Sequence, residues 1–277
     1  MKILYMGTAA AEGWPGLFCS CPICSHARKE GGKNLRTRTQ ALLDDEILLD
    51  FPPDSYCHAL KYGLDFGKLH TLLVTHSHMD HWFPTDIIHR HEHFGHGAEG
   101  VLDIYGNEAV EKAFYEHILI DRFKPHPIDD VVHFHRTHGG DRIHAGEWEI
   151  IAVPADHDKR EEPLVYICKK GGKTVFYGHD TGANLSPEAW DLLAAEHFDL
   201  ISLDATMGLK TIGGYHMGLP DIEPFIQKLT DLGCVDSHTV KVINHFSHNG
   251  EMTHDQLTAW GAERGILAAY DGMTVEF

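Results

Sequence analysis

Three histidines and one aspartate lie within six consecutive positions of this chain, in the segment His76-Ser77-His78-Met79-Asp80-His81. Imidazole and carboxylate groups are common ligands of divalent metal ions. An open catalytic ion usually takes three protein ligands, so four such residues indicate a site that two ions share. The apolar run before them, Leu69 to Val74, is typical of a buried strand that would fix their position. The segment therefore predicts a metal-dependent hydrolase.

Further ligand-type residues follow three other apolar segments that we expect to be strands. They are His157, Asp180 and His245, after the expected strands 148–154, 173–177 and 240–243. A loop at a strand end can hold such a side chain at the edge of a sheet. Taken singly, each would be interpreted as an ordinary polar loop residue. Because the polar groups between His76 and His81 would gain nothing from packing, we interpret the strand-end residues as ligands of the same site.

A second group of ligand-type residues lies nearer the N-terminus, where Cys19, Cys21 and Cys24 fall within six positions. Cysteines this close do not pair sensibly with one another, and thiolates are good ligands of zinc. Tetrahedral zinc needs a fourth ligand, for which we consider His248 first and His26 as a competitor. Such a closed site has no position for water, so we assign it a structural role. The alternative is a set of three reduced, buried thiols.

The composition is that of an ordinary globular protein, with 43% hydrophobic and 23% charged residues in a chain of 277. No apolar run approaches the length of a membrane span, and segment 1–7 is interpreted as a strand and not a signal peptide, so we expect a cytoplasmic protein. A net charge of −18 argues against binding of duplex nucleic acid. A small anionic substrate is compatible with this charge, because bound dications would invert the local potential.

Strands and helices alternate along the chain without an obvious domain boundary, so we expect one hydrolase domain over 1–277, with a cysteine-containing loop at about 7–32. Besides the strands named above, the pattern predicts strands at 2–6, 40–50 (a hairpin), 101–105, 130–135, 163–168, 199–203 and 273–277. Helices are expected at 54–62, 84–93, 107–120, 186–195 and 221–231, and after Thr253. The isolated cysteines Cys57, Cys168 and Cys234 are expected to be small, buried apolar residues. Sheets packed face to face under helical layers fit this order.

The segment His76 to His81 matches the HxHxDH signature of the metallo-β-lactamase superfamily, which essentially the whole chain resembles. The resemblance implies an α+β fold, a four-layered αββα sandwich with two divalent metal ions at one edge of the sheets. It assigns His76, His78 and His157 to the first ion, Asp80, His81 and His245 to the second, and Asp180 to a position between them. It also relates Asp50 to an aspartate that supports a metal-bound histidine; the alternative is a turn residue before Pro52.

The N-terminal loop indicates which group of the superfamily the chain resembles most. Residues 7–15, the three cysteines and the segment 245–248 resemble the phosphoribosyl 1,2-cyclic phosphate phosphodiesterases of the carbon–phosphorus lyase pathway. The superfamily member of pyrroloquinoline quinone biosynthesis has a similar cysteine loop, but its metal motif is degenerate, so the intact motif favours a hydrolase. Two features depart from the phosphodiesterases: Ala9 and Ala10 replace glycines, and the segment 82–96 carries additional histidines. These are His89, His91, His93 and His96, which could line a substrate pocket or form a solvated helix face.

The resemblance implies hydrolysis of a small, cyclic phosphodiester by two ions that activate a shared water. His216 is the candidate proton donor or phosphate contact, the alternative being an ordinary loop histidine, and Asp204 is expected to support the site or the fold. Zinc, manganese or iron suit the imidazole and carboxylate ligands, whereas the thiolates favour zinc. A homodimer is implied by the resemblance alone. The rival functions are a lactonase or another carboxylic-ester hydrolase, and a non-hydrolytic accessory protein like the quinone-pathway member.

Overall fold

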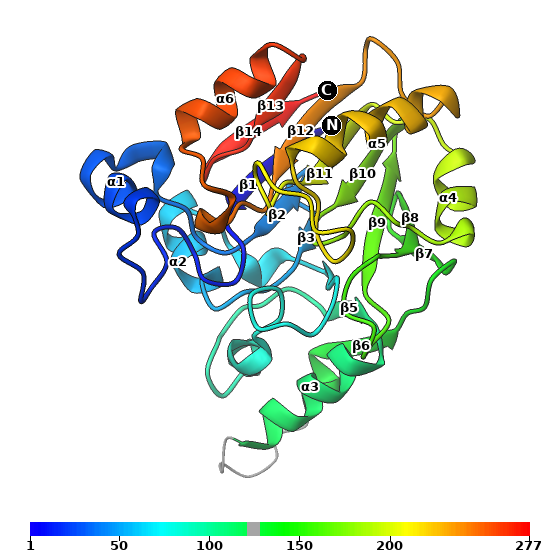
Figure 1. The fold of residues 1–277 in the computed structure, drawn as a ribbon. Helices are drawn as coiled ribbons and strands as arrows, with labels where there is room; N and C mark the ends of the chain where they lie inside the picture. The colour runs from blue at the N-terminus through cyan, green and yellow to red at the C-terminus, as the bar shows by residue number, and fades with distance from the viewer. Residues whose placement is uncertain (121–127) are drawn as a thin grey trace.

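The computed structural model of the chain describes residues 1–120 and 128–277, which form two β-sheets with helices outside them (Figure 1). Within these residues each sheet has seven strands. The first sheet has the order β14-β1-β2-β3-β4-β5-β6, with the bounds β14 Met273–Glu276, β1 Lys2–Gly7, β2 Gln40–Leu43, β3 Ile47–Leu49, β4 Thr71–Leu73, β5 Leu102–Gly106 and β6 Val132–Arg136. The second has the order β13-β12-β11-β10-β9-β8-β7, with the bounds β13 Ile266–Ala268, β12 Val240–Asn244, β11 Leu200–Asp204, β10 Lys173–Gly178, β9 Leu164–Lys170, β8 Trp148–Pro154 and β7 Arg142–Ala145.

The α-helices lie outside the two sheets and alternate with them along the chain (Figure 1). Their bounds are α1 Pro22–Glu30, α2 Ser55–Tyr62, α3 Glu108–Ile120, α4 Pro187–Ala194, α5 Leu219–Asp231 and α6 His254–Ala262. Short 3-10 helices span Gly32–Asn34, Phe66–Lys68, Pro84–Arg90, Ile128–Asp130 and His248–Gly250. Among the helices that the structure describes, none has the length and apolar character needed to span a bilayer.

Alternating residues of strand β1 face two different cores, as a period of two requires. Ile3 and Tyr5 belong to the core between the sheets, whereas Met6 belongs to the core on the outer face of the first sheet, to which Phe114 of helix α3 also belongs. Helices α4, α5 and α6 bury their apolar faces on the outer side of the second sheet, through residues such as Phe225. The arrangement is therefore helix, sheet, sheet, helix. The expected α+β fold, a four-layered αββα sandwich, is confirmed.

Parallel pairing positions the loops that carry the predicted ligands. Strands β3 to β6 run parallel in the first sheet, and β10 to β13 run parallel in the second. The carboxyl ends of parallel strands share one edge of a sheet, and ligands usually bind beyond that edge. The segment 76–81 follows β4, and Asp180 and His245 follow β10 and β12. The topology therefore directs these residues to the carboxyl edges of both sheets.

One α-helix and two strands were not predicted from the sequence pattern. Helix α1 lies inside the segment expected to be a loop, and it begins where the Cys21 side chain accepts a hydrogen bond from the Cys24 N–H. Strands β7 and β13 are too short for their alternation to stand out from the surrounding residues. The expected cap of the third helix is confirmed, because Asn107 Oδ1 accepts a hydrogen bond from the Val110 N–H at 3.0 Å.

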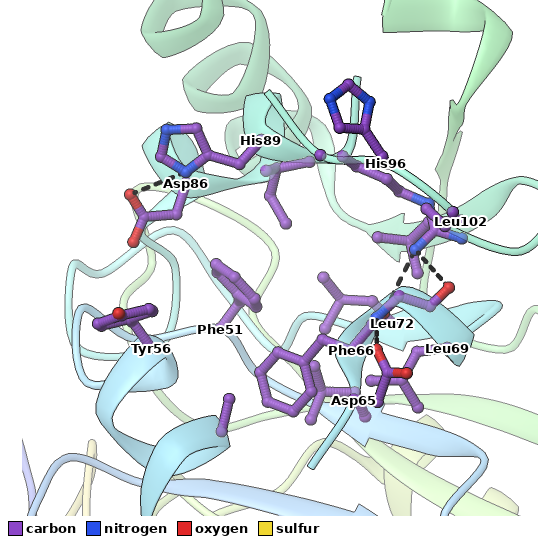
Figure 2. A pocket seen from close by; sticks show the side chains of 18 of the residues that line it. Phe51, Tyr56, Asp65, Phe66, Leu69, Leu72, Asp86, His89, His96 and Leu102 are labelled. Atoms are coloured by element: carbon purple, nitrogen blue, oxygen red, sulfur yellow. Dashed lines mark hydrogen bonds and ion pairs between the residues drawn. The ribbon is translucent and has the colours of Figure 1, made fainter. Parts of the chain in front are cut away.

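The segment after the metal-ligand motif differs from its prediction. A 3-10 helix ends at Arg90, whereas the sequence predicts a helix to residue 93. Histidine is a weak helix former, and Gly95 and Gly97 follow, so a longer helix is not sustained. The chain instead folds over a pocket that His89 and His96 help to line (Figure 2). The tract is therefore no continuous helix, but His89, His93 and His96 are solvent-exposed, as the solvated-face interpretation expects. The pocket is not the site of the predicted ligands.

His58 is a fully buried histidine that ties helix α2 to the first sheet, and it predicts a loss of stability in acid. Its Nδ1 lies 2.7 Å from Gln40 Oε1, and its Nε2 lies 2.7 Å from the Thr37 hydroxyl. Burial lowers the pKa of His58 from 6.5 to about 4. Protonation therefore favours the unfolded state, so the free energy of unfolding should fall as the pH drops through this window.

Urea unfolding of the native chain and of His58→Gln, at about pH 7 and about pH 5, checks this expectation. The glutamine keeps a polar side chain in the same place but does not titrate. The native chain should lose more stability than the variant between the two pH values. Equal losses would show that protonation of His58 contributes nothing.

Candidate metal-binding active site

The structure brings together all the residues that the sequence predicts as ligands of the paired site. One group of ligand atoms, all within 4.8 Å of one another, comes from His76, His78, His157 and Asp180. A second group within the same distance comes from Asp80, His81, Asp180 and His245. We call these the first and the second cluster. Asp180 belongs to both, which is the geometry of a shared ligand between two neighbouring cations.

Asp180 is almost completely buried between the clusters. Its Oδ2 lies 3.4 Å from His76 Nε2 and 3.0 Å from His81 Nε2. His245 Nε2 lies 3.7 Å from the same oxygen and 3.8 Å from Asp80 Oδ2. Although burial opposes ionisation, the neighbouring histidines hold the pKa of both carboxyls, Asp80 and Asp180, well below its usual value. Both groups are therefore anions at neutral pH.

Each imidazole of the two clusters uses one ring nitrogen to contact an oxygen atom and turns the other toward the centre. The outer contacts are His76 Nδ1 to Thr75 Oγ1 (3.0 Å), His78 Nε2 to Asp158 Oδ2 (3.1 Å), His81 Nδ1 to Asp50 Oδ2 (2.9 Å), His157 Nδ1 to the Tyr215 carbonyl (2.8 Å) and His245 Nδ1 to Thr206 Oγ1 (2.7 Å). Partners of this kind orient metal-bound histidines and fix their tautomer. The arrangement is therefore that of preformed metal ligands.

The inward-facing nitrogens do not have good partners among themselves. His81 Nε2 and His245 Nε2 face each other at 3.2 Å, as do His78 Nδ1 and His157 Nε2. His76 Nε2 is buried and has no hydrogen-bond partner among the described residues. Buried polar groups are normally satisfied, so these converging lone pairs fit cations better than they fit one another. The donor set, imidazole and carboxylate, suits divalent metal ions.

Asp50 occupies the position behind His81 that the resemblance implies. Its Oδ1 accepts hydrogen bonds at 2.9 Å from both the N–H and the hydroxyl of Thr75, and its Oδ2 contacts His81. The carboxylate is completely buried. It therefore joins the end of strand β4 to a predicted ligand, and the alternative of an ordinary turn aspartate does not describe these contacts.

Left-handed backbone conformations occur at three residues of the site. The φ angles are 63° at Asp50, 59° at Asp180 and 60° at His245, and each residue comes at the end of a strand. Such conformations cost on the order of 1–3 kcal/mol for a residue with a side chain, and they concentrate at functional sites. Here they turn the chain sharply where the sheet ends, so that the side chains point across the edge and not along it.

His216 lies beside the clusters, where its candidate role requires it. Its Nδ1 is 2.7 Å from Asp180 Oδ1 and 3.3 Å from Asp204 Oδ2. Burial lowers the pKa of His216, but the carboxylates of Asp180 and Asp204 outweigh this effect and raise the pKa to about 11. Asp204 is completely buried and also accepts hydrogen bonds from the backbone N–H groups of Thr206 and Met217. It therefore fixes the loop that carries His216.

Several supporting residues were not predicted from the sequence. Asp158 contacts His78 and pairs with the exposed Arg160, and Thr206 contacts His245. Glu161 accepts hydrogen bonds from the backbone and the hydroxyl of Ser77. Asp158 directly follows a predicted ligand, which is a signal that could have identified it. Thr206 and Glu161 carry no such signal, because their proximity to the site arises only from the fold.

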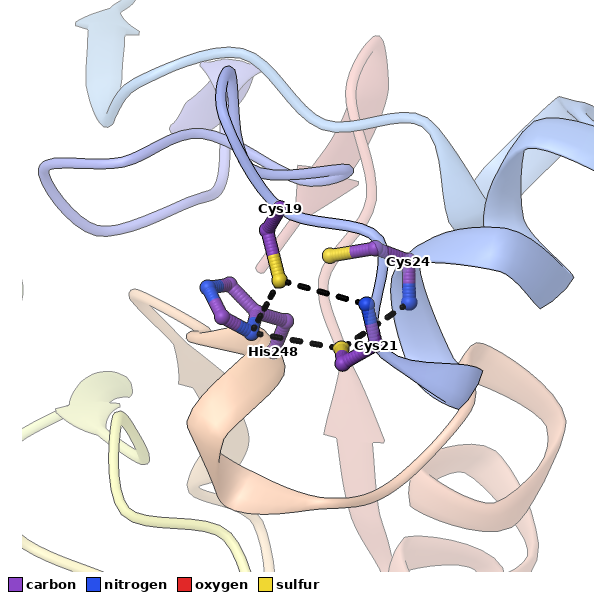
Figure 3. Close-up of side chains that lie close together, drawn as sticks. All are labelled: Cys19, Cys21, Cys24 and His248. Atoms are coloured by element: carbon purple, nitrogen blue, oxygen red, sulfur yellow. Dashed lines mark hydrogen bonds between the residues drawn. The ribbon is translucent and has the colours of Figure 1, made fainter.

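The three cysteines of the N-terminal loop gather around His248 (Figure 3). His248 Nδ1 lies 3.7 Å from Cys19 Sγ and 3.6 Å from Cys21 Sγ, and Cys24 Sγ belongs to the same group. Backbone N–H groups of Gly16 and Cys24 donate to the sulfurs, as expected where thiolates are stabilised. The competing candidate, His26, is not in the group, because the turn of helix α1 carries it away. We call this group the cysteine cluster.

The isolated cysteines behave differently from one another. Cys168 and Cys234 are buried, in agreement with the prediction, but Cys57 is exposed on helix α2. The prediction for Cys57 is therefore wrong. The Cys57 side chain lines an open pocket beside helix α2 and is not packed into a core.

A family model described as the beta-lactamase superfamily domain matches residues 47–246 of the chain. The chain belongs to the metallo-β-lactamase superfamily. The matched residues include both ligand clusters, Asp50 and Asp204. The N-terminal cysteines and His248 lie outside the match.

Individual relatives are distant in sequence. Coenzyme PQQ synthesis protein B of Methylobacterium radiotolerans is 26% identical over 148 residues, a match that covers 46% of this chain and 49% of that protein. The chain thus aligns with about half the length of this relative. Crystal structures of other proteins have the same fold over the whole length of this chain. A diphosphatase from the PhnP family has a TM-score of 0.74 and 23% identity, over 100% of this chain and 97% of that one. Zinc-bound PqqB from Methylobacterium extorquens has a TM-score of 0.72 and 17% identity, over 100% of both chains. The short form of human tRNase Z has a TM-score of 0.69 and 16% identity, over 100% of this chain and 99% of that one.

Proposed function

We propose that this superfamily member is a metal-dependent phosphodiesterase acting on a small phosphodiester, and on a cyclic one such as phosphoribosyl cyclic phosphate in particular. The observation that carries the proposal is the pair of complete ligand clusters that meet at Asp180. The PhnP-family diphosphatase, which has the same fold over nearly its full length, supports a phosphate substrate. The cysteine cluster supports the same group of enzymes, since its loop carries part of the sequence resemblance.

The residues of the two clusters fit two divalent ions. The first cluster would hold one ion and the second cluster the other, with Asp180 contacting both. Zinc, manganese or iron suit these ligands, and zinc suits the cysteine cluster. Two such ions, when bound, would acidify a water molecule and offset the negative charge of a phosphodiester.

The chain supplies His216 as a group that can act on the substrate itself. Its Nδ1 faces Asp180 and Asp204, which leaves Nε2 for a contact with the substrate, and the side chain is 22% exposed. A histidine held in this way can donate a hydrogen bond to a phosphate oxygen or a proton to the leaving alkoxide. Asp204 acts as a positioning residue, because it holds both the ring and the backbone of the loop.

The rival functions use different parts of the same structure. A lactonase or carboxylic-ester hydrolase would use the same ligands, so substrate preference must separate it from a phosphodiesterase. A non-hydrolytic accessory role follows from the similarity to PQQ synthesis protein B, whose sequence match is limited to about half of each chain although PqqB shares the fold over the whole chain. The intact ligand set favours a hydrolase over that role.

Turnover of the metal-loaded protein tests the proposal. Hydrolysis of bis-p-nitrophenyl phosphate and of phosphoribosyl 1,2-cyclic phosphate should exceed hydrolysis of a γ-lactone or p-nitrophenyl acetate, and His78→Ala should lose it. Metal content is measured on the same samples. A protein that binds two ions but hydrolyses neither phosphodiester would contradict the proposal, and a preference for the lactone would favour the rival hydrolase.

A further inference from the structure

Another group of metal-ligating side chains lies on the first sheet and shares no residue with the active site or the cysteine cluster. It contains Asp103 of strand β5 and His133 and His135 of strand β6. Each residue places one ligand atom within 4.8 Å of those of the other two. We call this group the edge cluster, because β6 is the last strand in the order of the first sheet as far as the structure describes it.

The two strands bring the three side chains to one face of the sheet. His133 and His135 are two positions apart, so both side chains point to the same face of β6. Asp103 lies directly opposite His133 in the parallel pairing of β5 with β6. The ring of Tyr105, on the same strand as Asp103, stacks on His135 with centroids 4.7 Å apart and an angle of 17° between the planes. The backbone and this ring contact therefore fix the group in place.

Both imidazoles of the edge cluster turn a nitrogen toward the same carboxylate oxygen. Asp103 Oδ1 lies 2.6 Å from His135 Nε2 and 3.7 Å from His133 Nδ1. The active site has the same pattern, since His81 Nε2 lies 3.0 Å from Asp180 Oδ2. Neither imidazole forms an ion pair with another carboxylate of the described residues. A proton joins the carboxylate to one imidazole at a time, whereas a divalent ion binds all three groups at once.

The edge cluster is open to solvent, unlike the active site. The side chains of Asp103, His133 and His135 are 37%, 53% and 44% exposed. Three protein ligands leave one position of a tetrahedral ion for water, which the solvent can supply here. Because an ion can reach the site from solution, its occupancy should follow the concentration of the free ion.

We propose that the edge cluster binds one zinc ion, which joins strands β5 and β6. Two imidazoles and a carboxylate suit zinc, whereas magnesium and calcium prefer oxygen ligands alone. Among the described strands β6 pairs with β5 only, so an ion that links the two stabilises the edge of the sheet. The proposal does not depend on the proposed phosphodiesterase activity, because the edge cluster shares no residue with the two ligand clusters.

Zinc analysis of the protein with its other metal sites filled tests the proposal. After equilibrium dialysis against zinc chloride, the native chain should hold one more zinc ion than His133→Gln or His135→Gln. Each variant lacks one of three ligands, so its affinity should fall by more than about a hundredfold, the upper end of the loss when a contact that only supports a ligand is removed. His144→Gln, at an exposed histidine of edge strand β7, is the matched control and should bind zinc like the native chain. Equal zinc binding by the native chain and both variants would overturn the proposal.

The melting temperature provides a second measurement on the same samples. Zinc at about a hundred times its dissociation constant should raise the melting temperature of the native chain by roughly 5–10 °C more than that of His133→Gln. An equal rise with magnesium chloride would contradict a site with imidazole ligands. Phosphodiester hydrolysis should be the same in the native chain and the variants, so the two proposals fail or succeed separately. If a variant does not fold, the imidazole nitrogen resonances of the native chain decide: zinc should shift those of His133 and His135, and unchanged resonances would overturn the proposal.

Discussion

Replacing Asp180 with alanine should remove nearly all of the proposed phosphodiester hydrolysis and lower the amount of metal that the two clusters bind. Residues that only support a metal ligand typically cost about 10- to 100-fold in affinity or activity when they are removed. Asp180 belongs to both clusters, and its Oδ2 lies within 3.7 Å of three of their histidines, so its loss should cost more than about a hundredfold. Turnover of bis-p-nitrophenyl phosphate and metal analysis by mass spectrometry check both expectations.

Two companion variants separate this role from a general effect on folding. Asp180→Asn keeps the volume of the side chain but removes its charge, so it should lose activity like the alanine variant. Asp231→Asn makes the same chemical change at an exposed carboxylate at the end of helix α5, and it should be neutral. If Asp180→Asn kept two ions and native turnover, the two clusters would not depend on a shared carboxylate.

The ligands of this site could be predicted from the sequence because each follows an apolar strand directly. His76 to His81 come after β4, and Asp180 and His245 occupy sharp turns at the ends of β10 and β12. A strand is a local pattern, and the residue that ends it has a defined place at the sheet edge. Both the ligand set and the layered fold could therefore be predicted from the sequence.

The residues that support the ligands were harder to predict from the sequence, because their positions depend on contacts between distant parts of the chain. Glu161 reaches Ser77 across 84 positions, and Thr206 reaches His245 across 39. No local spacing encodes such pairs. The same is true of the pocket beside residues 86–98, where a predicted helix gives way to a 3-10 turn. Tertiary packing creates the pocket, whereas the early end of the helix follows from the weak helix propensity of histidine and from the glycines beyond it.

Replacing Cys24 with serine should remove one zinc ion and lower the melting temperature of the protein. Cys24 is completely buried in helix α1, and its sulfur belongs to the group that also contains Cys19, Cys21 and His248. An ion present at about a thousand times its dissociation constant stabilises the fold by about 4 kcal/mol. For a chain of this size, that loss corresponds to a decrease of roughly 8–16 °C. Scanning calorimetry and zinc analysis measure the two effects, and Cys57→Ser, at the exposed cysteine, is the matched control.

The same substitution should also slow hydrolysis, because the cysteine cluster and the second ligand cluster share one loop. His248 follows His245 by three positions, and the Phe246 carbonyl accepts a hydrogen bond from the Ala10 N–H at 2.9 Å. An ion in the cysteine cluster would therefore hold in place the loop that carries His245. We expect about a tenfold loss of turnover in Cys24→Ser, the size seen when a supporting contact of a metal ligand is removed. A variant that lost zinc and melted earlier, but turned over substrate at the native rate, would show that the two sites are mechanically independent.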